Sequence, residues 1–147
     1  MKPAMLGRSE LVLAGLAPAQ GAPHRPVQVQ KLFFLIEKNV VEPLLHSTYF
    51  SFVPWSYGPF DANVYRELED LAEAGDVVIS SESSWRTYAL TPQGQNKADL
   101  ILASLSPTVR DYIWKINQFV RSLSFTQLVS SVYKAYPEMR VNSVFNG

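Results

Sequence analysis

The chain has 147 residues, of which 47% are hydrophobic and 18% charged, which excludes a disordered chain and predicts one domain over residues 1–147. Its 13 basic and 13 acidic residues balance, so the whole chain has no net attraction for nucleic acid or for an acidic membrane. The absence of cysteine excludes disulfides, zinc ribbons and thiol catalysis.

The N-terminal part of the chain is expected to form two helices. The nearest candidate for an apolar span, residues 11–17, begins after Glu10 and is too short to cross a bilayer, so we expect a first helix in a cytoplasmic protein. A loop at 17–26 follows. Apolar residues then recur at helical spacing to about residue 40, and Pro43 is expected to end this second helix. The apolar positions of the second helix are Val29, Leu32, Phe33, Ile36 and Val40.

The middle of the chain alternates between strands and a helix. Residues 49–55, rich in aromatic and β-branched side chains, predict a strand, and Tyr57-Gly58-Pro59 predicts a turn. Asp61 is a suitable N-cap for a helix that runs to about Ala74. Gly75 suits the position after that helix because glycine adopts a positive φ readily.

Two more strands and three helices complete the predicted order. Residues 76–81 and 85–90 predict strands joined by a polar turn at 81–84. Helices are expected from Thr91-Pro92, from Ser106-Pro107 to residue 121, and from Ser124, where Gln127 completes a capping box. The order predicts a mainly helical α+β fold: winged-helix-like helices, a small antiparallel sheet of strands near 49–54, 76–81 and 85–90, and C-terminal helices.

The sequence offers little chemistry for catalysis or metal binding. His24 and His46 fall in predicted loops without carboxylate partners at a helical spacing, so we expect surface histidines. No metalloprotease, nucleophile-elbow or phosphate-loop motif is present. We therefore expect no catalytic residues, no metal and no cofactor.

The charges are segregated along the chain. Residues 61–82 contain seven acidic residues and only one basic residue, Arg66. The helix at 61–74 takes the place of the recognition helix of a winged helix, and a face with several carboxylates would repel DNA phosphates. The carboxylates expected on its solvent side are Glu67, Glu69, Asp70 and Glu73.

The helix at 107–121 lies in the basic part of the chain, since residues 83–147 contain seven basic and three acidic residues. We expect one face outside its core stripe to carry Arg110, Trp114, Asn117 and Arg121. Two interpretations remain open. Trp114 either anchors a partner protein or stacks on a base, or it is buried against a neighbouring helix with arginine stems beside it.

Several short motifs are more specific than composition. They are Gln30-Lys31-Leu32-Phe33-Phe34-Leu35; Tyr57-Gly58-Pro59-Phe60; Val64-Tyr65 with Leu68, Leu71 and Gly75; and Tyr88-Ala89-Leu90-Thr91-Pro92-Gln93-Gly94. Over about residues 26–95 they resemble the Panacea-type antitoxin domain family, which is found beside many unrelated toxins and in phage-associated proteins. The resemblance implies that the chain neutralises or scaffolds a partner protein, and it implies no enzymatic activity.

The corner at Tyr57-Gly58-Pro59 also has a physical interpretation that does not depend on the family. Gly58 allows a left-handed or close backbone path, and Pro59 fixes φ beyond it. Trp55 and Tyr57 are expected to hold the strand against the following helix as a structural corner. They would form a binding surface if their side chains were exposed.

The sequence therefore predicts a non-enzymatic, antitoxin-like protein-binding module, whose acidic helix suits a basic partner such as a toxin encoded nearby. The same charges could pair the acidic helix of one copy with the basic helix of another in a homodimer. The alternative is a winged-helix DNA-binding transcriptional regulator that uses the helix at 107–121. The candidate partner-binding residues are Trp55, Tyr57, Arg66, Glu69, Asp70, Glu73, Arg110, Trp114 and Arg121.

Overall fold

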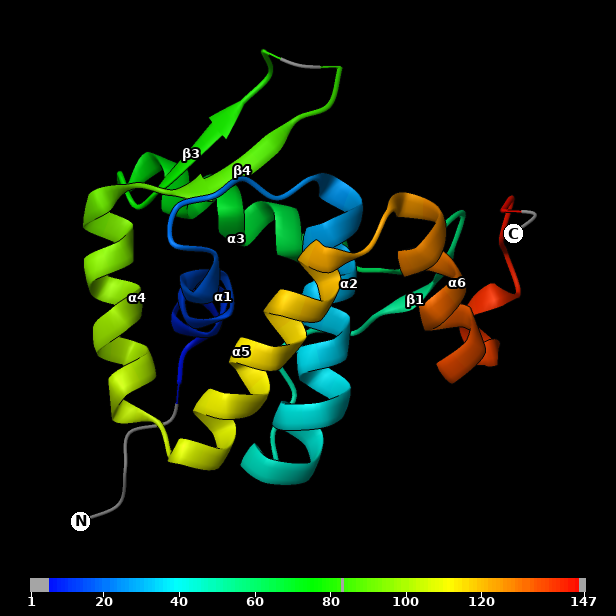
Figure 1. The fold of residues 1–147 in the computed structure, drawn as a ribbon, viewed down its shortest axis with the longest axis horizontal. Helices are drawn as coiled ribbons and strands as arrows, with labels where there is room; N and C mark the ends of the chain where they lie inside the picture. The colour runs from blue at the N-terminus through cyan, green and yellow to red at the C-terminus, as the bar shows by residue number, and fades with distance from the viewer. Residues whose placement is uncertain (1–5, 83, 146–147) are drawn as a thin grey trace.

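The computed structural model describes residues 6–82 and 84–145, and it confirms a mainly helical α+β fold (Figure 1). The elements in chain order are α1 (Arg8–Leu16), η1 (Ala17–Ala19), α2 (Pro26–Ile36), η2 (Glu37–Leu45), β1 (Val53–Trp55), β2 (Gly58–Phe60), α3 (Ala62–Glu73), β3 (Val77–Ser80), β4 (Thr87–Leu90), α4 (Pro92–Ser104), α5 (Pro107–Ser122), α6 (Phe125–Ala135) and η3 (Pro137–Arg140).

Helix α1 lies at the centre of the molecule (Figure 1) and packs against α2, α3, α4 and α5. Every residue from Leu11 to Leu16 is buried, as expected for a helix surrounded by other helices. The hairpin β3–β4 follows α3, so the predicted order of three helices and a wing is confirmed. The turn predicted at 81–84 includes Ser83, which lies outside the described residues.

The strands form two separate hairpins instead of the single expected sheet. β3 pairs with β4 in antiparallel register, and β1 pairs only with β2, which was expected to be part of a turn. The first expected strand is shorter than predicted because side chains bind the backbone N–H groups at its start. The Glu37 carboxylate accepts hydrogen bonds from the N–H groups of Tyr49 (2.7 Å) and Phe50 (2.8 Å). The Asp61 carboxylate accepts a hydrogen bond from the N–H group of Ser51 (2.8 Å). Residues 53–55 pair with residues 58–60 across a tight turn.

The prediction that Pro43 ends the second helix was wrong. The chain continues past Ile36 in the wider π-helical turns of η2 and ends at His46, whose φ is +50°. Proline lacks an N–H group and its ring crowds the carbonyl one α-helical turn earlier. The wider turns of a π-helix separate these groups, so the helical path can include Pro43.

His24 and Asn117 are buried in the core, so the prediction that His24 is a surface histidine was wrong. The backbone N–H and C=O of His24 pair with those of Tyr88 in β4 (2.8 and 2.9 Å), which draws the loop before α2 inward. Asn117 donates a hydrogen bond to the carbonyl oxygen of Gly15 (2.8 Å), so this face of α5 turns toward α1. Burial, and to a smaller extent the charge of Arg121, lowers the pKa of His24 to about 4.

The motif Leu90-Thr91-Pro92-Gln93-Gly94 fixes the start of α4 to the end of α3. The Thr91 hydroxyl donates to the carbonyl oxygen of Gly75 (2.7 Å) and accepts from the N–H of Gly94 (3.0 Å). A β-carbon on Gly94 would collide with the backbone carbonyl of Asp76. This element of the resemblance therefore has a structural role.

Candidate functional site

The structure distributes the predicted partner-binding residues over three places instead of gathering them into one site. Trp55 and Tyr57 flank the turn between β1 and β2, the four charged residues of the acidic helix lie on α3, and the remaining three lie on α5. Helices α3 and α5 each pack on α1 and α2. Each place is described separately below.

The aromatic corner of Trp55 and Tyr57 is exposed. Trp55 is 57% exposed and Tyr57 is 45% exposed, so the expectation that they hold the strand against the following helix was wrong. Tyr57 instead packs edge-on against Phe125 of α6, with 5.2 Å between ring centroids, and Trp55 lies 6.2 Å from Phe60. Both aromatic side chains are therefore accessible at the surface.

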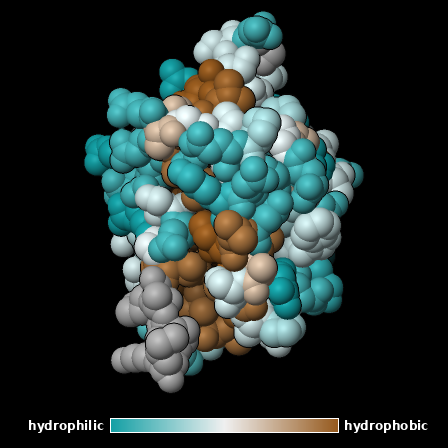
Figure 2. All heavy atoms as spheres, turned by 90° about the vertical axis from the view of Figure 1, so that its left-hand side faces the viewer, coloured by the Kyte–Doolittle hydropathy of each residue, from teal (hydrophilic) through white to brown (hydrophobic). Residues whose placement is uncertain are grey.

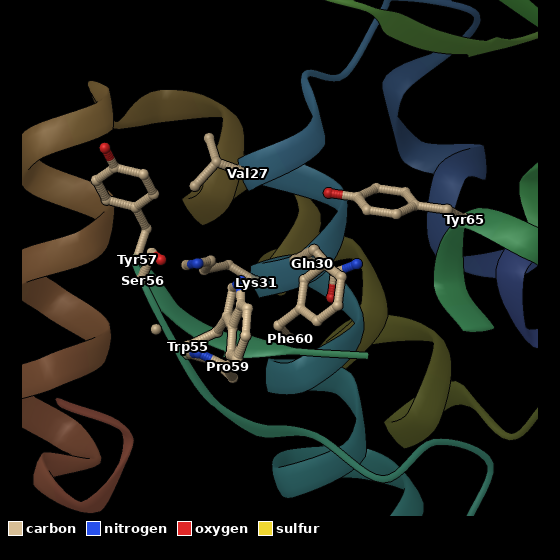
Figure 3. Close-up of a pocket in the computed structure, with 10 residues that line it drawn as sticks. Val27, Gln30, Lys31, Trp55, Ser56, Tyr57, Pro59, Phe60 and Tyr65 are labelled. Carbon is tan, nitrogen blue, oxygen red and sulfur yellow. The ribbon is translucent and has the colours of Figure 1, made fainter. Parts of the chain in front are cut away.

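A pocket of about 290 Å³ opens between the corner and α2 (Figure 3). Aromatic side chains form much of its lining, and they come from β1, β2, the turn between these strands, and α3. The lining residues are Val27, Gln30, Lys31, Trp55, Ser56, Tyr57, Gly58, Pro59, Phe60 and Tyr65. Gln30 and Lys31 thus meet the motif Tyr57-Gly58-Pro59-Phe60 in space, although they lie 26 or more positions before it in the chain.

Lys31 lines the pocket but was not among the site residues predicted from the sequence. Its side chain runs from α2 toward the β1–β2 turn (Figure 3), and it is only 3% exposed. No hydrogen bond or ion pair involves its ammonium group in the part of the chain that the structure describes. Burial lowers its pKa to about 8, so at neutral pH the pocket contains a buried positive charge without a counter-ion. The available signal was a lysine directly before the apolar run Leu32-Phe33-Phe34-Leu35-Ile36.

Hydrogen bonds hold the corner in place over α2. The Gln30 amide donates to the carbonyl oxygen of Asp61 (3.0 Å) and accepts from its N–H (2.9 Å). Gly58 has a φ of +110°, and a β-carbon there would lie 3.3 Å from Lys31 Nζ and 3.4 Å from the Tyr133 ring. The backbone N–H of Val144 donates to the carbonyl oxygen of Ser56 (2.9 Å), so the C-terminal residues support the turn from the other side. The pocket is therefore preformed.

The exposed face of α3 is acidic, as predicted, with one correction. Glu69, Asp70 and Glu73 are exposed, and so is Arg66, which donates to the side chain of Asn63 (3.2 Å). Glu67 is half-buried instead of solvent-exposed, because it accepts a hydrogen bond from Ser9 (3.1 Å) and lies 4.0 Å from the guanidinium of Arg8. Three carboxylates therefore remain available to a partner.

The face expected on α5 is divided between core and surface. Trp114 is 44% exposed, so it is not buried against a neighbouring helix, and Arg110 and Arg121 are half-buried. Asn117, placed on the same face from the sequence, points into the core. Of the four residues expected on this face, Trp114 is partly exposed, and the half-buried Arg110 and Arg121 lie one turn or more away from it on either side.

Apolar side chains are also exposed away from the corner. Figure 2 shows the side of the molecule that carries α4, where apolar atoms gather in the lower half below a more polar region. Leu100 on α4 is 74% exposed. The corner pocket differs from this surface because it contains the buried ammonium group of Lys31.

No protein-family model matches the chain, and no curated protein matches it either. Within residues 6–82 and 84–145, no three metal-binding side chains come together, and every helix falls short of the length and apolar character of a membrane span.

Proposed function

We propose that the protein is a non-enzymatic binding module that holds a partner protein at near-equal stoichiometry, as an antitoxin-like neutraliser of the kind that the Panacea resemblance implies. The observation that carries this proposal is the exposed pair Trp55 and Tyr57 at the mouth of a preformed pocket. Tryptophan and tyrosine are enriched among residues that dominate protein interfaces, and a rigid surface loses little entropy on binding.

The acidic face of α3 supports a protein partner with a basic surface. Its exposed carboxylates have few basic neighbours, so they produce a local negative potential on a chain with no net charge. Complementary charge of this kind raises the association rate more than the final affinity. A basic toxin whose gene lies beside that of this protein is the partner that we propose.

Co-expression with the product of the neighbouring open reading frame tests the proposal. We expect toxicity of the neighbour to be relieved and a complex of near-equal stoichiometry to be isolated. Tyr57→Ala should weaken the complex about tenfold or more, as truncation of a central aromatic residue does. Tyr112→Ala is the matched control, because Tyr112 is equally exposed, at 45%, but lies on α5.

Two outcomes would contradict this function. If no neighbouring gene product is toxic and none co-purifies, the protein does not act as an antitoxin. If Tyr57→Ala and Tyr112→Ala weaken the complex equally, the corner is not the binding surface.

A transcriptional regulator is the second candidate, favoured by the order of three helices and a wing. Because the carboxylates of α3 would repel DNA phosphates, such a regulator would bind DNA through α5. The test is salt-dependent binding to random duplex DNA, with Arg110→Glu and Arg121→Glu combined in one variant. Tight binding by the wild type at physiological salt that this variant abolishes would favour the regulator over the antitoxin.

A further inference from the structure

We propose that the corner pocket recognises a carboxylate side chain of the partner protein, which pairs with the ammonium group of Lys31 while the adjoining partner residue packs against Trp55 and Tyr57. This inference rests on the proposed function for the existence of a protein partner. It adds the chemical group that the pocket selects.

The first argument is that the protein itself leaves the Lys31 charge uncompensated. Taking an ammonium group out of water is strongly unfavourable unless an anion or several hydrogen-bond acceptors replace the lost hydration. The only cause that shifts its pKa is burial, and it shifts the pKa downward, as expected for a cation without an anionic neighbour. A group with this unmet requirement favours a ligand that supplies a negative charge.

The second argument is that the buried carboxylates on the segments adjoining Lys31 in the fold have other partners. Asp61, next to the corner, accepts hydrogen bonds from the N–H groups of Asn63 and Ser51, both at 2.8 Å. Glu37, on the helical segment that continues α2, accepts from the N–H groups of Tyr49 and Phe50. Each of these carboxylates is engaged by backbone N–H groups, so neither could pair with Lys31 without giving up those hydrogen bonds.

The third argument concerns which anion fits. The pocket contains one cation, and its other lining side chains are mainly aromatic or aliphatic. Phosphate groups carry up to two charges and are usually bound by several basic side chains or backbone donors. A carboxylate carries a single charge and brings an apolar stem that suits the aromatic walls. One ammonium in an apolar pocket therefore matches a carboxylate better than a phosphate.

The fourth argument favours a protein over a free small molecule. Pockets for small ligands bury most of the ligand surface and are lined by enclosed side chains. Here Trp55 and Tyr57 extend beyond the pocket and stay about half-exposed, so they can contact a surface larger than the pocket itself. A side chain inserted from a folded or extended partner segment would use both the pocket and these flanking rings.

Peptide binding followed by two-dimensional nuclear magnetic resonance tests this inference without knowledge of the partner. The probes are acetyl-Ala-Glu-Leu-amide and its twin, acetyl-Ala-Gln-Leu-amide, which differ only in charge. We expect the glutamate peptide to shift the Trp55 indole N–H and the Gly58 amide resonances in a saturable way at millimolar concentration. The glutamine peptide should bind about tenfold more weakly or worse.

Two variants complete the test. Lys31→Met keeps the length of the side chain but removes the charge, and we expect it to abolish the preference for glutamate over glutamine. Lys38→Met is the matched control, because Lys38 is an exposed lysine on η2 that already pairs with Glu42 (3.2 Å), and it should keep the preference. Thermal unfolding of both variants shows whether each one is folded before its binding is interpreted.

The outcomes separate this inference from the proposed function. Equal binding of the two peptides, no binding of either, or an unchanged preference in Lys31→Met would overturn carboxylate recognition. If a partner complex forms and depends on Tyr57 but is unaffected by Lys31→Met, the binding function stands and the carboxylate inference fails. If the peptides behave as expected but no partner complex exists, the proposed function fails instead.

Discussion

Replacing Lys31 with methionine should make the protein more stable. The substitution keeps an unbranched side chain of similar length in the pocket and removes a charge that the folded chain does not compensate. Exchanging buried charges for apolar groups of similar volume is often neutral or stabilising. If the substitution increases stability, the lysine at this position serves binding and does not serve folding.

The size of the effect follows from the pKa of Lys31. Its pKa is about 8 in the folded protein and 10.5 in the ordinary case, so the charged form costs the folded state about 3 kcal/mol at neutral pH. Between these two values the unfolded chain binds the proton more strongly than the folded chain does. The free energy of unfolding of the wild type should therefore rise with pH across this interval, and about 2 kcal/mol of the rise should occur between pH 7 and pH 9.5.

Urea unfolding of the wild type and of Lys31→Met at a series of pH values measures this effect. Three tyrosines, Tyr49, Tyr65 and Tyr88, have pKa values raised chiefly by burial, which lowers stability at high pH, but they are present in both proteins. The difference between the two proteins therefore isolates Lys31. It should be largest at pH 7, in favour of the variant, and should shrink toward pH 9.5.

Two results would refute this reasoning. If the two stability curves stay parallel from pH 7 to pH 9.5, the ammonium group of Lys31 is not desolvated in the folded protein. If Lys31→Met is less stable than the wild type at pH 7, the lysine makes favourable contacts that outweigh its buried charge.

Two further predictions concern His24 and Gly58. The pKa of His24 is about 4 in the folded protein and 6.5 in the ordinary case, so the free energy of unfolding should fall by up to about 3 kcal/mol as the pH decreases through this interval. In urea unfolding, His24→Gln should lose this pH dependence. Identical pH profiles of stability for the wild type and His24→Gln would contradict the prediction. Gly58→Ala should lower the free energy of unfolding by about 1–3 kcal/mol, because alanine is strained at a φ of +110° and its β-carbon would crowd Lys31 Nζ. An unchanged urea midpoint for Gly58→Ala would show that the corner relaxes without strain.

Local signals in the sequence predicted most of the fold. Asp61, Thr91, Ser106 and Ser124 cap their helices with side-chain hydrogen bonds as expected, because a cap depends only on residues within the next turn. Gly75 takes a positive φ after α3 for the same kind of local reason. The wing was predictable because its two strands alternate clearly around a polar turn.

The errors arose where distant parts of the chain decide the outcome. Residues 49–52 have strand-like composition, but the carboxylates of Glu37 and Asp61 take their backbone donors. His24 is followed two residues later by a proline and resembles a surface loop residue, but pairing with Tyr88 in β4 buries it. The sequence shows Lys31 only as a charge beside an apolar run, since its pocket exists only when the corner folds over α2.

The position of the pocket relative to α3 sets a pattern that a partner should satisfy. Tyr65 lines the pocket, and Glu69 and Glu73 follow it at intervals of four residues, so the three share one side of α3. At a helical rise of 1.5 Å per residue, these carboxylates lie roughly 6 and 12 Å along the helix axis from Tyr65. A partner that places a carboxylate on Lys31 should therefore present basic side chains beyond it, on the side of the pocket where Tyr65 begins this row of α3 residues. An entirely basic partner surface would be attracted to the carboxylates of α3. It would be repelled at the pocket, because it would bring further positive charge toward the uncompensated ammonium group of Lys31. The required combination of one acidic residue beside a basic patch is more selective than either feature alone, since mismatched charges at either position would oppose binding.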